Sequence, residues 1–391
     1  MAKSFETLAV HAGEDRKANH GAVSVPIYNA SVYAFTDADE GAAVHNHEKP
    51  GYYYGRLGNP TQTALEHTIA ELEGGDAALA FASGMAAVSA SVLTLAKAGD
   101  HIIAPESMYS TTTNFFKHLT ENLHFETTFV DAVRAENYAA AIRDNTRIIW
   151  IETPSNPLLR IADIQKIAAE ARNRGVRTIA DNTFATPYNQ RPLDLGVDLV
   201  IHSATKYLGG HSDLTAGLMI GGREIVEKAR LVTTKLYGGN ISPQVAWLLL
   251  RGIKTLAVRM ERHNNNAYAL ANMLENHPKV KSVFYPGLSN HENHDVAKKQ
   301  MSGFGGMLSF DVGSVEAGKT FVNAVRVCTL ATSLGGVESI VQHSASMTHA
   351  AIPREERLRT GISDGLIRFS VGIEGIDDLM SDVEQALSAI Q

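Results

Sequence analysis

Apolar and polar positions follow a regular order between residues 61 and 210. Short apolar runs alternate with longer stretches in which apolar residues recur at the spacing of one helix face. The pattern predicts helices over 61–73, 86–99, 111–119, 135–143 and 161–174, and strands over 77–82, 101–104, 125–130, 148–152, 178–180 and 199–201. Strands and helices in alternation favour a mostly parallel sheet covered by helices, which is an α/β fold.

The pattern changes on either side of this region. Residues 1–60 contain Pro26, Pro50 and the run YYYGRLGNP, and they show too little periodicity for a packed unit. A long helix is predicted from about residue 242, with a possible break near Gly252. It is followed by strands at 280–285 and 307–312 and helices at 315–324 and 376–390. We therefore expect an N-terminal arm (1–60), a large domain (61–250) and a smaller α+β domain (251–391).

Composition narrows the functional classes. The chain has 391 residues, 44% of them hydrophobic and 20% charged, with a formal net charge of −7. A negative balance without clusters of Lys and Arg argues against a nucleic-acid surface. No membrane-spanning run and no signal peptide are visible, and the single cysteine, Cys328, cannot form an internal disulfide. We expect a cytoplasmic protein that acts on small molecules, without nucleic-acid or membrane partners.

The stretch DLVIHSATKYLGG carries the strongest chemical signal. Its apolar run predicts a buried strand that places Ser203, Thr205 and Lys206 just past the carboxyl end of the strand. Open α/β sheets bind their ligands at this edge. The lysine could be an ordinary surface residue in a turn. It could also be a desolvated amine with a lowered pKa that forms a Schiff base, with the two hydroxyls holding an anion.

Other strand ends carry polar groups that could meet this lysine. ETPSNP (152–157) and DNTFATP (181–187) each follow an apolar strand, so Asp181 and Lys206 are expected on neighbouring strands. The Ser83-Gly84-Met85 turn, between a strand and a helix, predicts an anion site at the helix N-terminus. Arg368, in LIRFSVG, is a candidate for binding a carboxylate.

Three further patterns have weaker interpretations. GSVEAGKT (313–320) matches a phosphate-binding loop and leaves a non-catalytic nucleotide-binding protein as a remote alternative. Ser203 and Lys206 fit the S-x-x-K pattern of penicillin-binding enzymes, but no K-T-G partner is present. NHENH (290–294) lacks the spacing of a zinc helix and predicts a solvated loop, so we expect no metal site. Cys328 is expected to be a small core residue.

A lysine, an aspartate one strand earlier, an anion turn and an arginine together meet the needs of pyridoxal phosphate. This cofactor requires a lysine for covalent attachment, a carboxylate for its pyridine nitrogen, an anion site for its phosphate and a cation for the substrate carboxylate. Each element alone is a weak signal, and the ordered set is a strong one.

The sequence resembles the Cys/Met-metabolism pyridoxal-phosphate enzymes, which include cystathionine γ-lyase, cystathionine γ-synthase, methionine γ-lyase and the homoserine-ester sulfhydrylases. Seven segments carry the resemblance across nearly the whole chain: YYYGRLGNPT, ASGMAA, ETPSNP, ADNTFATP, SATKYLGGH, SLGGVES and HSASMTHA. The resemblance implies fold type I, like that of aspartate aminotransferase, with pyridoxal 5'-phosphate as cofactor. It also implies a homotetramer built from two catalytic dimers.

The resemblance assigns roles residue by residue. It implies that Lys206 is the Schiff-base lysine and proton carrier, that Asp181 contacts the pyridine nitrogen, and that Tyr109 stacks on the cofactor ring and helps protonate the leaving group. The residues that would hold the phosphate and the ring are Ser83, Gly84, Met85, Asn156, Ser203 and Thr205, with Tyr54 and Arg56 reaching into the neighbouring subunit. Arg368, Ser333 and Asn156 would bind the substrate carboxylate.

The reaction depends on the outer pocket, where the sequence differs more from the motifs of the family. Methionine γ-lyases carry a cysteine two positions after the stacking tyrosine, and here that residue is Thr111; Thr332 precedes Ser333. GGVES (335–339) is more similar to the cystathionine enzymes. A hydroxyl-rich pocket favours γ-elimination from a polar γ-substituted L-amino acid, with cystathionine as the default and an O-linked homoserine derivative possible. Replacement on an O-acyl-L-homoserine and a methionine γ-lyase are the alternatives.

Overall fold

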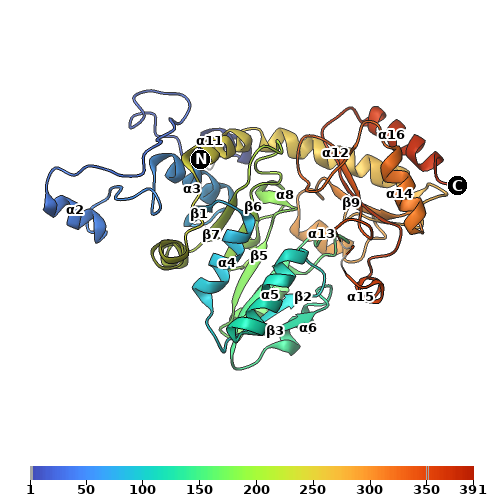
Figure 1. Cartoon of the computed structure of the whole chain (residues 1–391), viewed down its shortest axis with the longest axis horizontal. Helices are drawn as coiled ribbons and strands as arrows, with labels where there is room; N and C mark the ends of the chain where they lie inside the picture. The colour runs from blue at the N-terminus through green and yellow to red at the C-terminus, as the bar shows by residue number, and fades with distance from the viewer. Residues whose placement is uncertain (1–2, 349, 351) are drawn as a thin grey trace.

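The computed structural model describes residues 3–348, 350 and 352–391. It contains a seven-stranded sheet and a five-stranded sheet. Figure 1 shows the larger sheet in the middle of the molecule, the smaller sheet towards the C-terminus and α2 far from both. No helix in the described ranges has the length and apolar character needed to cross a membrane.

The large sheet has the order β1-β7-β6-β5-β4-β2-β3. Its pairings are parallel except those of β7, which is antiparallel to β1 and β6. The predicted strands are confirmed, and β7 is an addition that the sequence reading missed. The strands are β1 (Ala77–Phe81), β2 (His101–Pro105), β3 (Glu126–Val130), β4 (Thr146–Glu152), β5 (Arg177–Asp181), β6 (Leu199–Ser203) and β7 (Gly217–Gly221).

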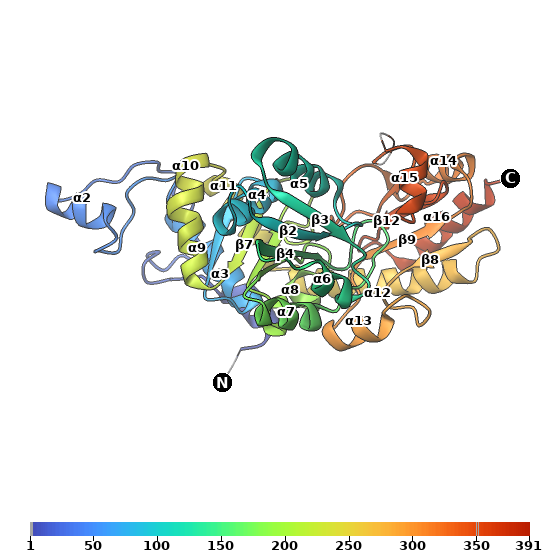
Figure 2. The same cartoon turned by 90° about the horizontal axis from the view of Figure 1, so that it is seen from below.

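Helices cover both faces of this sheet (Figure 2). Apolar residues of α4 (Gly84–Leu95) and α5 (Ser110–Leu123) pack on one face. Those of α6 (Ala135–Ala141) and α7 (Ile164–Asn173) pack on the other face. The strands are buried between these layers, which explains why they read as continuous apolar runs.

The first 60 residues are more structured than their sequence suggested. Helix α1 (Phe5–His11) packs through Ala9, Phe5 and Leu8 into the same core as α3 (Pro60–Glu73). This part of the predicted arm therefore belongs to the body of the protein. Helix α2 (Ala38–His45) projects from it (Figure 1). The short amphipathic turn of α1 was missed because seven residues give too little periodicity.

Two helices lead from the large sheet to the small one. The predicted break near Gly252 is confirmed, since α11 (Pro243–Ile253) ends there and α12 (Leu256–Glu275) begins three residues later. Leu256 and Met260 of α12 pack into the large-sheet core, whereas Leu270 and Leu274 pack into the small-sheet core. The expected domain boundary at residue 250 falls inside α11 and stays a prediction.

The small sheet has the order β10-β11-β12-β9-β8. Its strands are β8 (Ser282–Phe284), β9 (Met307–Asp311), β10 (Thr329–Leu330), β11 (Ile340–His343) and β12 (Leu366–Ser370). Helices α14 (Val315–Ala324) and α16 (Ile376–Ser388) pack on it, as predicted. Cys328 is buried in the same core. The remaining elements are α8 (Thr186–Asn189), η1 (Pro192–Leu195), α9 (Arg223–Lys228), η2 (Ala229–Thr234), α10 (Lys235–Tyr237), α13 (His294–Gln300) and α15 (Arg354–Arg359).

The nucleotide-loop pattern at 313–320 forms no phosphate loop. Ser314 caps α14 by accepting the Ala317 N–H at 3.1 Å, so Lys319 lies inside the helix. A Cβ on Gly318 would stand 2.5 Å from His343, which shows that this glycine serves helix packing. The structural basis for the nucleotide-binding alternative is therefore absent from this segment.

The NHENH loop also differs from its prediction. His291 is buried, and its Nε2 lies 3.0 Å from the carbonyl oxygen of Leu159. Burial lowers the pKa of His291 to about 4. The loop is packed against the large domain at this residue, so the expectation of a solvated loop is wrong for His291. No group of three or more His, Cys, Asp or Glu side chains within the described part of the chain could hold a metal.

Gly217 gives a test of how tightly β7 supports the turn before α4. A Cβ at this position would stand 2.1 Å from the Ser83 carbonyl oxygen. We expect Gly217→Ala to lower the free energy of unfolding by about 1–3 kcal/mol, because overpacking displaces the backbone. Urea unfolding measures this change. Gly222→Ala is the control because nothing lies within 4 Å of its added Cβ, and equal stability losses in the two variants would contradict the close approach.

Candidate active site

A cavity of about 400 Å³ lies at the carboxyl ends of the large-sheet strands and is closed by residues of the small sheet. Lys206 and Asp181 come from the end of β6 and β5, and Arg368 comes from β12. The predicted residues that line it are Ser83, Gly84, Met85, Tyr109, Asn156, Asp181, Ser203, Thr205, Lys206, Thr332, Ser333 and Arg368. The cavity thus brings together groups that are up to 285 positions apart in the chain (368 − 83).

The turn that carries Lys206 is held from two sides. Buried Arg259, on α12, donates through Nη1 to the Tyr207 carbonyl at 2.7 Å and through Nη2 to the Gly252 carbonyl at 2.8 Å. On the other side Gly335, with φ +76°, approaches so closely that a Cβ would stand 2.7 Å from the Tyr207 nitrogen. These contacts fix the lysine between the two domains.

Lys206 is partly buried, and its Nζ donates to the Ser333 Oγ at 2.6 Å. Burial and the positive charge of Arg368 lower the pKa of this amine to about 8. At neutral pH roughly a tenth of such a lysine is the free amine, compared with less than about a thousandth of an ordinary lysine. The structure therefore favours the desolvated, reactive lysine over the surface lysine.

Arg368 is buried among neutral partners. Its Nη1 donates to the Asn156 Oδ1 at 3.0 Å and its Nη2 to the Ser333 carbonyl at 2.8 Å. When the Gln342 side chain is oriented with its amide oxygen towards the guanidinium, that oxygen accepts from the Arg368 Nε at 2.8 Å. Within the described residues no carboxylate forms an ion pair with it. Burial lowers the pKa of Arg368 to about 10. A buried cation of this kind is suited to an anionic ligand.

Two carboxyl groups stand side by side at the end of the sheet, because Glu152 and Asp181 are register partners on β4 and β5. Thr183 donates to the Asp181 Oδ1 through its backbone N–H at 3.0 Å and its hydroxyl at 2.5 Å. Burial raises the pKa of Asp181. Burial and the charge of Asp181 raise the pKa of Glu152, and the hydrogen bonds from the Tyr109 and Asn156 N–H groups oppose this rise. Glu152 was quoted in a motif but not chosen as a site residue, since one strand-end carboxylate had already been assigned.

The turn before α4 has the geometry of an anion cradle. Ser83 caps the helix by accepting the Ala86 N–H at 3.1 Å. Gly84 approaches Ser203 so closely that a Cβ would stand 2.8 Å from its side chain. The backbone N–H groups of a first helical turn have no intrahelical acceptor, and the hydroxyls of Ser203 and Thr205 line the same cavity.

Three predicted residues lie outside the cavity in this chain. Tyr54 is 41% exposed, and the Arg56 Nη1 donates to the Lys235 carbonyl at 2.6 Å. Thr111 is exposed on α5, one position away from Thr112, which does line the cavity. Thr111 was chosen by counting from Tyr109, and only the helical geometry shows that the next residue points inward.

The cavity has further lining residues that the sequence analysis did not select as site residues. They are Val88, Thr112, Glu152, Pro154, Thr183, Phe184, Ile201, Thr215, Leu334 and Thr348.

GGVES has a structural role that its sequence did not reveal. Gly335 packs on the lysine turn, and the Val337 N–H donates to the Gly210 carbonyl at 3.0 Å. The cavity is lined by Thr332, Ser333 and Leu334, just before this segment, and not by residues 335–339. In HSASMTHA, the adjacent motif, His349 lies outside the described residues.

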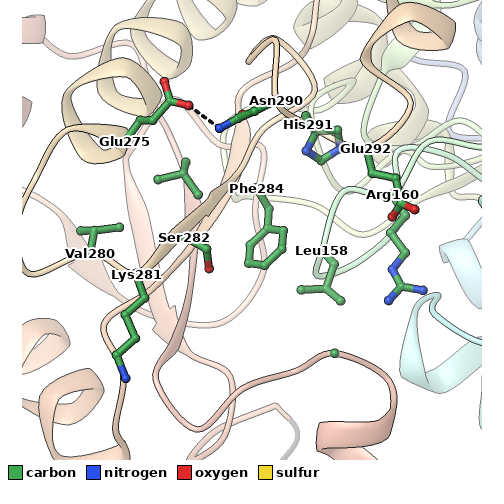
Figure 3. Close-up of a pocket in the computed structure, with 12 residues that line it drawn as sticks. Leu158, Arg160, Glu275, Val280, Lys281, Ser282, Phe284, Asn290, His291 and Glu292 are labelled. Atoms are coloured by element: carbon green, nitrogen blue, oxygen red, sulfur yellow. Dashed lines mark hydrogen bonds between the residues drawn. The ribbon is translucent and has the colours of Figure 1, made fainter.

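A larger cavity, of about 580 Å³, lies away from these groups (Figure 3). Leu158 and Phe284 form its apolar part, and Glu275 on its wall accepts from the Asn290 amide at 2.6 Å. Its amine, Lys281, lies on the far side of the apolar part from Arg160 in this view. The smaller cavity is the better candidate for catalysis because it brings together a lysine of lowered pKa, two carboxyl groups and an arginine that has no carboxylate partner within the described part of the chain.

Comparison with known proteins supports this choice. A family model described as "Cys/Met metabolism PLP-dependent enzyme" matches residues 6–388. The chain belongs to this family. It is 49% identical over 386 residues to cystathionine gamma-lyase of Bacillus subtilis (98% of this chain, 99% of the relative). It is 46% identical to L-methionine gamma-lyase of Fusobacterium nucleatum (98% of each chain). It also superposes on the crystal structure of cystathionine gamma-lyase from Lactobacillus plantarum with a TM-score of 0.93, at 45% identity and complete coverage of both chains.

Membership of this family makes the protein a pyridoxal-phosphate-dependent enzyme with fold type I, and it is similar over nearly its whole length to relatives named as lyases. The cavity fits the cofactor on its own structural terms. Its glycine at the anion cradle leaves no space for a side chain, its lysine has a lowered pKa, and a carboxyl group lies on the neighbouring strand. In this fit Ser83, Gly84, Met85, Ser203 and Thr205 would hold the phosphate, and Lys206 and Asp181 would hold the ring.

The pKa of Lys206 can be tested in the cofactor-free protein. We expect the rate of its reaction with added pyridoxal phosphate to rise about tenfold per pH unit below pH 7 and to level off above about pH 9, because the amine reacts only when unprotonated. Absorbance of the bound cofactor follows the reaction, with Lys206→Ala as the blank. A rate that continues to rise up to about pH 10 would show an ordinary lysine instead.

Proposed function

We propose that the protein catalyses γ-elimination from a polar γ-substituted L-amino acid, with cystathionine as the default substrate. One observation carries the proposal: a lysine of lowered pKa and a buried arginine that has no carboxylate partner among the described residues line one cavity, together with several hydroxyls. The relatives named as lyases support elimination over replacement. The polar wall, which includes Thr112, Thr332 and Ser333, supports a polar substituent.

The residues divide the work in the following way. Bound pyridoxal phosphate supplies an electron sink that acidifies the substrate α-carbon. Arg368 binds the substrate carboxylate, and Asn156 and the Ser333 carbonyl orient its guanidinium. The Lys206 Nζ accepts the Cα proton and can carry it, since its pKa near 8 allows both protonation states at neutral pH. Ser333 lies within hydrogen-bond distance of that nitrogen.

The leaving group departs toward the outer part of the cavity. Tyr109 lines the cavity and is 44% exposed, and we assign to its hydroxyl the donation of a proton to the departing atom. With cystathionine, loss of the γ-substituent as cysteine and addition of water give 2-oxobutanoate and ammonia. The alternative is attack of a thiol in place of water, which would give a thioether, and an O-acyl-L-homoserine would then be the substrate. A methionine γ-lyase would release methanethiol by the first route.

We also propose that the active enzyme is a homotetramer made of two catalytic dimers, in which Tyr54 and Arg56 complete the neighbouring subunit's phosphate site. Both lie far from the cavity of their own chain, beside exposed apolar residues such as Leu236 and Tyr237. Apolar residues of this kind are typical of a surface that a partner covers. The second subunit would place the arginine where an anion is held.

A product screen tests the reaction. Purified protein with cofactor is given L-cystathionine, L-methionine, O-acetyl- and O-succinyl-L-homoserine or L-canavanine, each with and without cysteine. We expect steady 2-oxobutanoate from cystathionine without added thiol, measured with lactate dehydrogenase and confirmed by mass spectrometry. Methanethiol from methionine at a higher kcat/KM would make the protein a methionine γ-lyase. Pyruvate would indicate β-elimination, which is relevant because a cystathionine beta-lyase of Lactococcus lactis is 46% identical. Product only with cysteine would contradict elimination.

Hybrid subunits test the role of Arg56. Lys206→Ala and Arg56→Ala proteins are each expected to have little activity. After dissociation and mixing, we expect activity to return to about a quarter of sites, because half of the dimers are hybrids and each hybrid has one site with both native residues. If Arg56 acted within its own chain, mixing would restore nothing. Unmixed samples taken through the same procedure are the control.

A further inference from the structure

Glu152 occupies the end of β4, beneath the cavity that it helps to line. Its side chain is 5% exposed. Within the described residues no lysine or arginine forms an ion pair with it, unlike Glu66, a similarly buried glutamate that pairs with Arg230 at 2.8 Å. Burial of a carboxylate without a cation is unfavourable in free energy unless hydrogen bonds compensate for it, so the hydrogen bonds of Glu152 indicate its role.

Those hydrogen bonds come from two backbone N–H groups of residues that also line the cavity. The Tyr109 N–H lies 3.1 Å from Oε1 and 2.9 Å from Oε2 of Glu152. The Asn156 N–H lies 2.9 Å from Oε1. One side chain therefore connects the residue that begins α5 to the loop that follows β4.

The connection continues to the arginine. Asn156 accepts from the Arg368 Nη1 through its own side chain. Tyr109 begins α5 without a side-chain cap, so the carboxylate also serves as an acceptor at the helix N-terminus. A carboxylate at that end is favoured by the helix dipole. Tyr109, Glu152, Asn156 and Arg368, which all line the cavity, thus form one continuous chain of hydrogen bonds.

We propose that Glu152 is a positioning residue that holds Tyr109 and Asn156 at a fixed separation, and so aligns the tyrosine ring with the arginine that binds the substrate. This inference rests on the proposed function for the identity of the reaction. The contacts of Glu152 with Tyr109 and Asn156 are the same whichever γ-substituent leaves. The two N–H donors favour the ionised carboxylate and so oppose the effect of burial and Asp181, which raise its pKa.

Substitution with glutamine makes a sharp test, because it keeps the size of the side chain. In Glu152→Gln, the amide oxygen at the Oε1 position has to accept from both the Asn156 N–H and the Tyr109 N–H, while an NH₂ group replaces Oε2, the oxygen nearer to the Tyr109 nitrogen. Donor then faces donor, and Tyr109 is expected to move while Asn156 and Arg368 stay. Misplacement of a reacting group by about 1 Å costs up to about 100-fold in rate. We expect kcat to fall at least about tenfold, with KM changed by less than about threefold.

The second readout is the circular dichroism of bound pyridoxal phosphate, which reports the asymmetric environment of the ring. We expect a changed spectrum in Glu152→Gln at unchanged cofactor content. Glu66→Gln is the matched control, since it also neutralises a buried glutamate that accepts a backbone N–H, that of Ala80 at 3.1 Å. It should lose stability while keeping the native spectrum and kcat.

Three outcomes would overturn the proposal: native kcat and spectrum in Glu152→Gln, equal kcat losses in the two variants, or a loss confined to KM. If Glu152→Gln does not fold, hydrogen exchange of the native holoenzyme decides the matter. The Tyr109 and Asn156 N–H groups should be protected, and fast exchange at both would refute the connection. If the product screen finds β-elimination or replacement, the same kinetic comparison is made with that substrate, so a wrong reaction and a wrong role for Glu152 give different results.

Discussion

Two cations share one partly enclosed cavity, and the rest of the site depends on this arrangement. Arg368 and Lys206 are close enough for the guanidinium charge to lower the pKa of the amine. The arginine has neutral partners only among the described residues. Bringing a positive charge into low dielectric is unfavourable unless a ligand or a proton loss relieves it. The arrangement therefore favours a free amine at Lys206 and an anionic group at Arg368, which are the two conditions that an amino-acid substrate and a carbonyl cofactor need.

The two cations reach one another only because two sheets pack together. Lys206 follows a strand of the large sheet, whereas Arg368 lies within a strand of the small one. A buried hydrogen bond connects the two parts of the molecule at this point. Ser309, which lies opposite Arg368 on β9, donates to the Pro157 carbonyl in the loop after β4 at 2.7 Å. Helix α12 contributes to both cores and carries Arg259, which fixes the lysine turn. A small shift of one domain against the other would therefore displace Lys206 relative to Arg368 while leaving the core of each domain intact.

Motifs and structural roles did not coincide everywhere. GGVES was read as a sign of substrate class, and the structure shows that it supports the lysine turn. The glycine-lysine pattern at 313–320 was a chance match, since the helix already begins after its cap Ser314 and leaves no loop between Gly313 and Lys319 to surround a phosphate. Conversely, Glu152 was overlooked because its importance lies in the two N–H groups that it accepts, and hydrogen bonds between distant segments leave no local pattern.

The sequence by itself determined the α/β class, most strands of the large sheet, and the lysine, aspartate, arginine and anion turn that identify the cofactor. These features are local: strand burial makes apolar runs, and the chemistry requires particular residue types just after them. Only the tertiary structure decided that Thr112 rather than Thr111 faces the cavity, that α1 belongs to the body of the protein, and that Arg368 stands beside Lys206 without a carboxylate partner among the described residues. Such facts depend on contacts between segments far apart in the chain, and neither periodicity nor spacing records them.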